Sequence, residues 1–264
     1  MPEFGYGSAI FNRVQPRSEW RMMIDQGFVD IQRSLLPRQR PELVGYEFFD
    51  YYRPVHLVSG EYFDYVTRSD GRLAVVVADF CGMGTGVSLL MAFLAGAAKL
   101  CLAAGGDPAA GIHVLNDLFC RHVDGHFVTL IMIVLDHHRH EATIVNAGHP
   151  APLWRHADGT VEEPGKEQCG LPLGIVHGID YQEATIPVAP GDMLLLYTDG
   201  ISDAMNPAGR MFSVKQLRSG LGVAQGDAVT AGNEIVADVI QHMGSARQND
   251  DMCLVCLRRS PAAL

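Results

Sequence analysis

Apolar residues follow two different spacings along this chain, and the spacings separate expected helices from expected strands. Across residues 19–36 they recur every three to four positions, which predicts an amphipathic helix that Pro37 ends. Short runs rich in β-branched and aromatic residues, bounded by Pro, Gly and Asp, predict strands. We expect strands at 44–52, 60–67, 72–79, 128–136, 142–148, 152–159, 181–188, 193–198 and 251–258, and further helices at 87–103, 108–122, 214–221 and 228–243.

The order of these elements predicts the fold class. Strand meanders with hairpin-length turns, interrupted by paired helices, favour antiparallel sheets covered by helices over βαβ repeats. The expected fold is therefore an α+β sandwich. A length of 264 residues and a hydrophobic content of 48% suit one large domain. We divide the chain into a tail or linker at 1–18, the helix at 19–37 and a single domain at 38–260.

The periodicity of the helix at 19–37 leaves its role open. It fits a helix packed on its own domain as well as a signalling helix that joins an upstream sensory or receiver domain. The same apolar stripe suits pairing with a second copy of the chain. A homodimer through residues 19–36 is thus an expectation from periodicity alone.

Charge and composition narrow the class of protein. The chain has 30 Asp and Glu against 20 Lys and Arg, a formal net charge of −10, which disfavours nucleic-acid binding and suits a site that collects metal cations. No apolar run reaches the roughly 18 residues of a membrane span, and the start lacks the regions of a signal peptide, so we expect no membrane contact and a cytoplasmic location. The six cysteines have no disulfide spacing, and Cys253 and Cys256 point to opposite faces of an expected strand, so we expect reduced core thiols.

Four acidic residues lie at the ends of strongly apolar strands. Asp79 follows AVVVA, Asp199 follows MLLLYT, Asp250 precedes MCLVCL, and Glu61 opens EYFDY. Any one of them alone is an ordinary turn former. Brought together at one sheet edge, they would repel one another unless cations bind between them. Oxygen ligands favour Mg²⁺ or Mn²⁺, and two such ions can share a bridging hydroxide for attack on phosphorus.

Three other features have simpler structural interpretations. His149 lies in an apolar strand-to-turn segment, where we expect a hydrogen-bonded structural residue more than a general acid. The cluster at 137–140 is expected to be a solvated hairpin. The glycines of Gly82-Met83-Gly84 and Gly86 suit a tight strand-to-helix turn, with phosphate contact at the following helix as an additional hypothesis.

Seven segments, in order, resemble the bacterial PPM (type 2C-like) serine/threonine phosphatases, and most closely the RsbU/SpoIIE subgroup. They are IQRSLLP, VSGEYFDY, VADFCGMGTGVSLLMA, NAGHPAPL, GLPLGI, GDMLLLYTDGISDAMNPAGRMF and NDDMCLVCLR, which extend over residues 31–258. The resemblance implies a four-layer sandwich of two antiparallel sheets flanked by helices. It also implies a site for two divalent cations, Mn or Mg, at one edge.

The resemblance also implies roles for individual residues. Asp79 would bridge both metals, with help from the Phe80 carbonyl, while Asp199 and Asp250 would complete one metal. Glu61 would hold the other metal. Asp251 would orient water or ligands without binding the metals directly. No protein nucleophile is implied.

The chain departs from the family pattern at three places. Ser59-Gly60-Glu61 replaces the usual Gly-Gly-Asp, Cys81 replaces a small polar residue, and Met252-Cys253 replaces an apolar-Thr pair. Glu keeps the carboxylate of Asp but reaches one methylene farther, which leaves open a weak enzyme. We interpret the change at Met252-Cys253 as core packing.

The resulting hypothesis is hydrolysis of phosphoserine or phosphothreonine on a small regulatory protein, such as an anti-sigma-factor antagonist. By resemblance, the chain would be the output domain of a response regulator in a two-component system. An alternative is a non-catalytic module that binds a phosphoprotein or an anti-sigma factor. A third hypothesis, a nucleotidase, lacks a recognisable set of base-stacking or ribose-binding residues.

Overall fold

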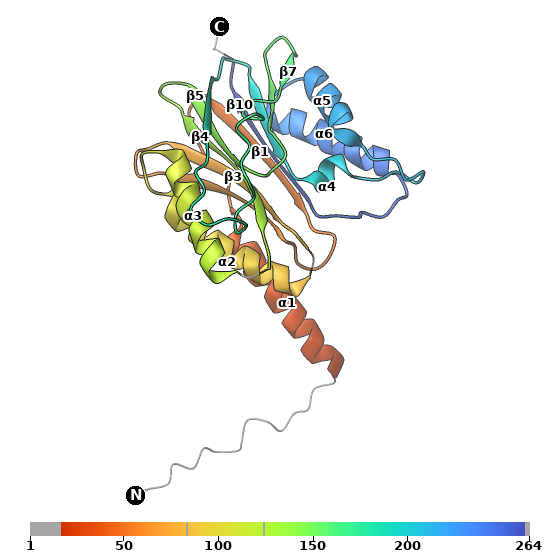
Figure 1. Ribbon diagram of the computed structural model, residues 1–264. Coiled ribbons are helices and arrows are strands. Elements are labelled where there is room, and N and C mark those ends of the chain that lie inside the picture. Colours follow the sequence, from red (N-terminus) through yellow and green to blue (C-terminus); the bar gives the residue numbers. More distant parts are fainter. Residues whose placement is uncertain (1–16, 83, 124, 262–264) are drawn as a thin grey trace, which may run out of the picture.

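The computed structural model describes residues 17–82, 84–123 and 125–261, and these form two antiparallel five-stranded sheets. One sheet has the strand order β1-β10-β9-β6-β7 and the other β2-β3-β4-β5-β8 (Figure 1). The strands are β1 (Tyr46–Arg53), β2 (Glu61–Thr67), β3 (Leu73–Phe80), β4 (Val128–Asp136), β5 (Glu141–Ala147), β6 (Leu153–Arg155), β7 (Val161–Glu162), β8 (Glu183–Pro187), β9 (Met193–Tyr197) and β10 (Met252–Arg259). The helices are α1 (Arg17–Leu35), α2 (Thr85–Leu102), α3 (Pro108–His122), α4 (Asp199–Ser202), α5 (Ser213–Val223) and α6 (Ala228–Met243).

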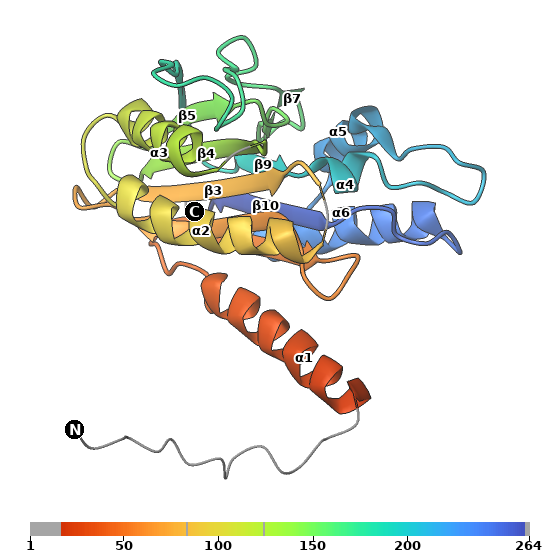
Figure 2. The ribbon, with the colours of Figure 1, turned by 60° about the horizontal axis from the view of Figure 1, so that its bottom comes forward.

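The sheets stack face to face, and helices cover both outer faces (Figure 2). Alternation along β3 explains the layers, because successive side chains point to opposite faces of a strand. Val75 and Val77 pack between the sheets, whereas Val76 and Ala78 pack under α2 and α3. A third cluster lies between the other sheet and α5 and α6. The predicted four-layer α+β fold is confirmed.

The strand predicted at 152–159 is shorter and continues differently. β6 ends at Arg155, and the chain turns and returns as β7, which pairs with β6 through Trp154 and Glu162. Gly159 has a φ of 89°, and its N–H bonds the carbonyl of His156. A left-handed glycine of this kind closes a hairpin rather than extending a strand. Asp199, predicted in a turn, instead opens the single helical turn α4.

Helix α1 begins at Arg17, two residues before the predicted start, and ends at Leu35. Leu35 and Leu36 pack against the core beneath α2 and α3. Residues 1–16 of the predicted tail lie outside the described residues, and dimer formation through this helix stays a prediction. No helix in the described ranges is long and apolar enough to cross a membrane.

The cysteines are free thiols. Cys253 packs between the two sheets, whereas Cys256, three residues along β10, packs beneath α5 and α6. Both are fully buried, and burial raises the pKa of the Cys256 thiol to about 12. The pair therefore lies on opposite faces of the strand, as predicted.

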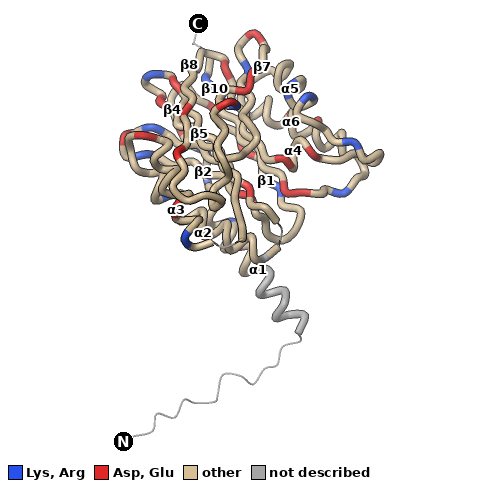
Figure 3. Tube along the Cα trace, viewed as in Figure 1, with Lys and Arg blue, Asp and Glu red and all other residues tan. Residues whose placement is uncertain are grey.

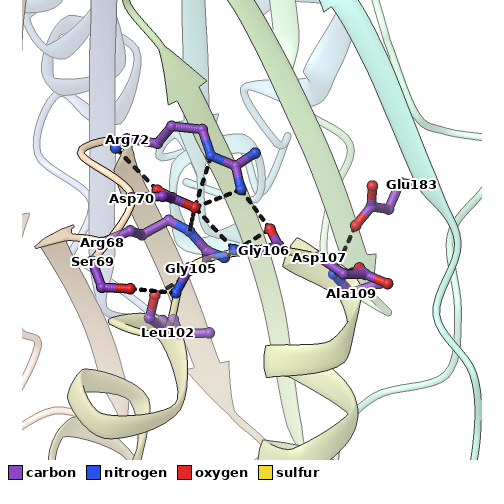
Figure 4. A network of polar contacts seen from close by, with 10 residues as sticks. All are labelled: Arg68, Ser69, Asp70, Arg72, Leu102, Gly105, Gly106, Asp107, Ala109 and Glu183. Carbon is purple, nitrogen blue, oxygen red and sulfur yellow. Dashed lines mark hydrogen bonds and ion pairs between the residues drawn. The ribbon is translucent and has the colours of Figure 1, made fainter.

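A polar network holds the β2–β3 turn against the loop between α2 and α3 (Figure 4). Arg68 is buried and donates to the carbonyls of Leu102 and Gly106 at 3.1 and 3.2 Å. Asp70 pairs with Arg72 at 2.7 Å and accepts the Gly106 N–H at 3.0 Å. These bonds fix the β2–β3 hairpin to the loop between α2 and α3, and so they help to fix the position of β3.

Replacing Asp70 by Asn is expected to destabilise the fold at neutral pH by about 1 kcal/mol, since solvent screens the partly exposed ion pair. The hydrogen bonds from Arg72 hold the pKa of the Asp70 carboxyl below its usual value. Its contribution is therefore present above the unfolded-state pKa and lost as the pH falls through the folded-state pKa. Urea unfolding of both proteins at neutral and acid pH tests this. A difference in stability that does not shrink in acid would contradict it.

Two carboxyl groups meet at the start of α3 (Figure 4). One belongs to Asp107, just before the helix, and the other to Glu183, the first residue of β8. Asp107 is the N-cap, and its Oδ1 accepts the Ala109 N–H at 2.8 Å. Glu183 Oε1 accepts the same N–H, also at 2.8 Å. Since the contact with Glu183 lowers the pKa of Asp107, while burial and Asp107 raise that of Glu183, the two groups favour sharing one proton.

Candidate metal centre

The ends of strands from both sheets bring four carboxyl groups to one end of the sandwich. Glu61 is the first residue of β2 and lies directly opposite Asp79 of β3. Asp199 begins α4 just after β9, and Asp250 comes just before β10. After burial, the charges of Asp199 and Asp250 contribute to the raised pKa of Asp79, so these three carboxyl groups interact electrostatically. In Figure 3, acidic segments are visible beside α4 and β1.

Glu61 and Asp79 face the layer between the sheets. Phe63 and Val77, two residues further along each strand from the site, belong to the core between the sheets. Side chains two apart share a face, so the two carboxyls point inward from the end of that core. Like charges directly opposite each other on neighbouring strands are destabilising. The pairing of Glu61 with Asp79 is therefore unfavourable when both carboxyls are charged.

Burial makes this repulsion stronger. Glu61 is 2% exposed, and its Oε2 atom has no hydrogen-bond partner in the described part of the chain. Burial, and then the charges of Asp79 and other nearby acids, raise the pKa of Glu61 well above its usual value. Burial, and then the charge of Asp199, raise the pKa of Asp79 to about 7. Both effects disfavour two bare carboxylates at neutral pH.

The other two acids lie closer to solvent. Asp199 is exposed and Asp250 half-buried. Burial and the charge of Asp250 raise the pKa of Asp199, and burial is the largest cause of the raised pKa of Asp250. The site thus runs from a buried carboxyl to an exposed one. A ligand can approach from the exposed side.

Asp251 is placed to support this site. Its Oδ1 accepts the Val55 N–H, and its Oδ2 accepts the Gly60 N–H at 3.3 Å. Its own N–H donates to Asp250 Oδ1 at 2.8 Å. Asp251 therefore holds the loop before Glu61 and orients Asp250, which fits the positioning role expected of it.

Sequence reasoning did not find the contribution of Gln32. This α1 side chain is 6% exposed, and it accepts the Ser59 N–H at 2.9 Å and donates to the Ser59 carbonyl at 2.6 Å. Ser59 Oγ in turn accepts the Glu61 N–H at 2.9 Å. Gln32 is spaced four residues from both Phe28 and Leu36, which places it on the apolar side of the helix, and a polar residue at such a position was the available signal.

The position after Asp199 has to be glycine because the backbone of Asp251 lies against it. A Cβ atom at position 200 would lie 1.8 Å from the backbone oxygen of Asp251. Only glycine allows α4 to approach the start of β10 this closely. The close approach brings Asp199 and Asp250 to the same end of the sheet.

The donor set fits hard divalent cations. It is made of oxygen atoms, one of them buried and unpartnered, and the carboxyls have raised pKa values that a cation would lower. No group of three or more His, Cys, Asp or Glu side chains among the described residues is arranged to hold a metal ion as it stands. The ligand roles of Glu61, Asp79, Phe80, Asp199 and Asp250 remain proposals.

The turn between Asp79 and α2 has the expected tight geometry. Gly82 and Gly84 have φ values of 117° and 96°, which side chains disfavour, and α2 begins at Thr85. Met83 lies outside the described residues. Cys81 is an exposed free thiol. Phosphate contact at the start of α2 stays a hypothesis.

His149 joins the two sheets from within. Its Nε2 lies 3.1 Å from the Tyr197 carbonyl, which can only accept, so this nitrogen carries the proton. Its Nδ1 then accepts from Thr129 Oγ1 at 2.8 Å. The side chain is 4% exposed, and burial lowers its pKa to about 3. This arrangement favours the structural role expected for His149.

Replacing His149 by Phe should lower the free energy of unfolding by roughly 2 to 4 kcal/mol, because the Tyr197 carbonyl and the Thr129 hydroxyl lose their buried partner. The rate per folded molecule at saturating metal should change little. Urea unfolding and steady-state kinetics measure the two effects. A large loss of kcat with unchanged stability would instead identify His149 as a catalytic acid.

Comparison with known proteins identifies first the fold class of this chain and then its family. The fold matches that of the SiaA-PP2C domain of Pseudomonas aeruginosa with a TM-score of 0.77 and 21% identity, covering 92% of this chain and 98% of that one. The sandwich is therefore a PP2C-type phosphatase fold. Residues 69–260 match the family described as Stage II sporulation protein E (SpoIIE). Because this match covers more than half of the chain, the chain belongs to the SpoIIE family.

Two curated relatives extend this comparison. Protein IcfG of Synechocystis sp. is 24% identical over 269 residues, which cover 91% of this chain and 42% of its own length. Phosphoserine phosphatase RsbU of Bacillus subtilis is 26% identical over 182 residues, which cover 68% of this chain and 53% of its own length. The chain thus spans about half the length of these relatives. The predicted resemblance to PPM phosphatases of the RsbU/SpoIIE subgroup is confirmed.

Proposed function

We propose that this chain is a metal-dependent phosphoprotein phosphatase that hydrolyses phosphoserine or phosphothreonine. The observation that supports it most is the pair Glu61 and Asp79, opposite each other on β2 and β3 and buried with raised pKa values. A fold gains no stability from such a pair unless cations occupy the space beside it. The similarity to a phosphoserine phosphatase, RsbU, supports the reaction.

Each acidic residue has a place in this reaction. Asp79 would contact two Mn²⁺ or Mg²⁺ ions, Asp199 and Asp250 one of them, and Glu61 the other. Bound there, the cations would supply a hydroxide at neutral pH and neutralise phosphate charge. In the overall reaction the oxygen of water bonds to phosphorus, the bond from phosphorus to the serine oxygen breaks, and that oxygen leaves with a proton. Asp251 would keep Asp250 and the loop before Glu61 in position.

The proposed substrate is a small phosphorylated regulatory protein of the anti-sigma-factor antagonist type. The support is the SpoIIE family match together with the similarity to RsbU. The exposed side of the site, at Asp199, suits a phosphorylated side chain presented on a protein surface. An upstream sensory or receiver domain would act through α1, whose Gln32 contacts the loop that carries Glu61.

Release of phosphate from a phosphoserine peptide tests the reaction. We expect turnover with Mn²⁺ or Mg²⁺ and none after EDTA. Asp158→Asn, a change in an exposed hairpin turn far along the chain from these acids, is the matched control and should retain full activity. A folded protein that binds Mn²⁺ by calorimetry but releases no phosphate under any condition would favour the alternative, a phosphoprotein-binding module.

A further inference from the structure

Arg155, at the end of β6, is a buried cation without a counter-ion. The residue is 8% exposed, and its Nε atom is buried with no hydrogen-bond partner among the described residues. None of the ion pairs formed within that part of the chain includes it. Buried charged groups are normally paired, because an unpaired one loses its hydration without compensation. The absence of a carboxylate here therefore indicates a missing partner.

Arg155 lines a pocket of about 240 Å³. Arg258 of β10 lines it from another strand, and Gly191, Gln225 and Gly226 form part of the wall. Because a water molecule occupies about 30 Å³ of liquid, the pocket has room for a phosphate-sized ion. Two arginines, on strands to either side of β9, thus border one small volume.

The carboxylate that pairs with Arg258 is already engaged by other donors. Glu47 Oε2 lies 3.4 Å from Arg258 and also accepts the Ala228 N–H at 3.0 Å. Its Oε1 accepts the Ser260 hydroxyl at 3.1 Å. The Nε of Arg258 is itself buried without a partner. Glu47 therefore pairs with Arg258, which also contributes, after the Thr230 N–H, to the lowered pKa of Asp227, whereas no carboxylate among the described residues pairs with Arg155.

Nearby Asp192 does not supply the missing charge. Its Oδ2 accepts the Trp154 indole N–H at 3.1 Å and the Ala189 N–H at 2.9 Å. Its Oδ1 lies 3.9 Å from His156. The residue is 2% exposed, so its carboxylate faces the interior.

We propose that this pocket, which we call the Arg155 pocket, binds a small oxyanion of the phosphate or carboxylate type. Guanidinium groups recognise such anions through paired N–H donors, and they bind them more strongly where water is partly excluded. The site is separate from the metal centre. Arg155 lies opposite Met193 at the start of β9, whereas Asp199 follows the far end of that strand, which at 3.3 Å per residue is roughly 20 Å away.

Thermal unfolding in EDTA tests the proposal without any metal. Inorganic phosphate should raise the Tm relative to chloride at equal ionic strength, because it binds only the folded state. In ¹H–¹⁵N spectra of the unaltered protein, the amide signals of Gly191 and Gly226 should shift as phosphate is added. Acetate provides a separate arm, and a response to it in place of phosphate would identify a carboxylate group as the ligand.

Three single substitutions test whether phosphate binds at Arg155. Arg155→Met should weaken phosphate binding at least about tenfold, since a charge-assisted hydrogen bond is lost. Without added anion it should be no less stable than the unaltered protein, because an unpaired buried charge is gone. Arg210→Met, a change of an exposed arginine, and Asp79→Asn, a change at the metal centre, should both retain the phosphate effect.

Two results would overturn the proposal. One is a phosphate effect that Asp79→Asn removes and Arg155→Met leaves intact, which would place the anion at the metal centre. The other is the absence of any Tm change or amide shift with phosphate or acetate up to about 20 mM, where a site of millimolar affinity would be nearly filled.

Discussion

Asp79→Asn is expected to lower metal-dependent phosphate release at least about a thousandfold, because the carboxylate proposed to contact both cations is lost. In EDTA near pH 8 the same variant should be more stable than the unaltered protein. Its amide removes a buried charge from opposite Glu61, and the carboxyl it replaces has a pKa of about 7. A shift of about three pKa units corresponds to roughly 4 kcal/mol.

Loss of activity together with a gain in stability is the informative combination. Calorimetric titration with Mn²⁺ and urea unfolding in EDTA measure the two parts separately. Asp70→Asn is the matched control, because it removes a carboxylate that pairs with arginine and should lower stability without affecting metal binding. If Asp79→Asn were destabilised to the same extent as Asp70→Asn, the burial of the Asp79 charge, together with its repulsion by Asp199, would not be the main feature of the site.

The second large effect is a dependence of metal-free stability on pH. The folded-state pKa values of Asp79 and Glu61 lie above their unfolded values. Between the two pKa values the folded protein binds more protons than the unfolded chain, so the free energy of unfolding falls as pH rises. This contribution is complete below about pH 4 and, for Asp79, is lost by about pH 7. Saturating Mn²⁺ should restore stability, and more at pH 8 than at pH 5.

Urea unfolding at several pH values, with EDTA and with Mn²⁺, measures this dependence. The two curves should diverge as pH rises. Parallel curves would mean that the carboxyl groups are not neutralised by the cation, and that the ligand roles proposed for Glu61 and Asp79 are wrong.

Local sequence pattern predicted most of the fold and part of the site. Strands such as β3 and β4 were evident because β-branched residues fill both faces. The opposition of Glu61 and Asp79 also follows from local information, since a hairpin turn centred on Asp70 pairs residues at equal distances on either side. Strand order carries no such local signal. The pairing of β1 with β10, which positions Asp250, joins residues about 200 positions apart in the sequence, such as Tyr46 and Arg259.

Sequence pattern also missed one hairpin and several single hydrogen bonds near the site. The hairpin that forms β7 depends on the left-handed conformation of Gly159, and the Asp158-Gly159 pair inside the predicted strand was the signal that should have ended that strand. The contacts of Gln32 and Asp251 with the loop before Glu61 connect distant segments through single hydrogen bonds. Residue periodicity reports which side of an element is buried, and it does not report such individual bonds.

The position of β10 has a consequence for synthesis of the protein on the ribosome. This strand lies between β1 and β9, and it is the last strand of the described chain. The sheet that contains β1 therefore cannot close until residue 259 has left the ribosomal exit tunnel. Asp250 and Asp251 emerge only shortly before. Until then a nascent chain holds no complete set of the acidic residues proposed as metal ligands, so metal binding at this site has to follow the synthesis of β10.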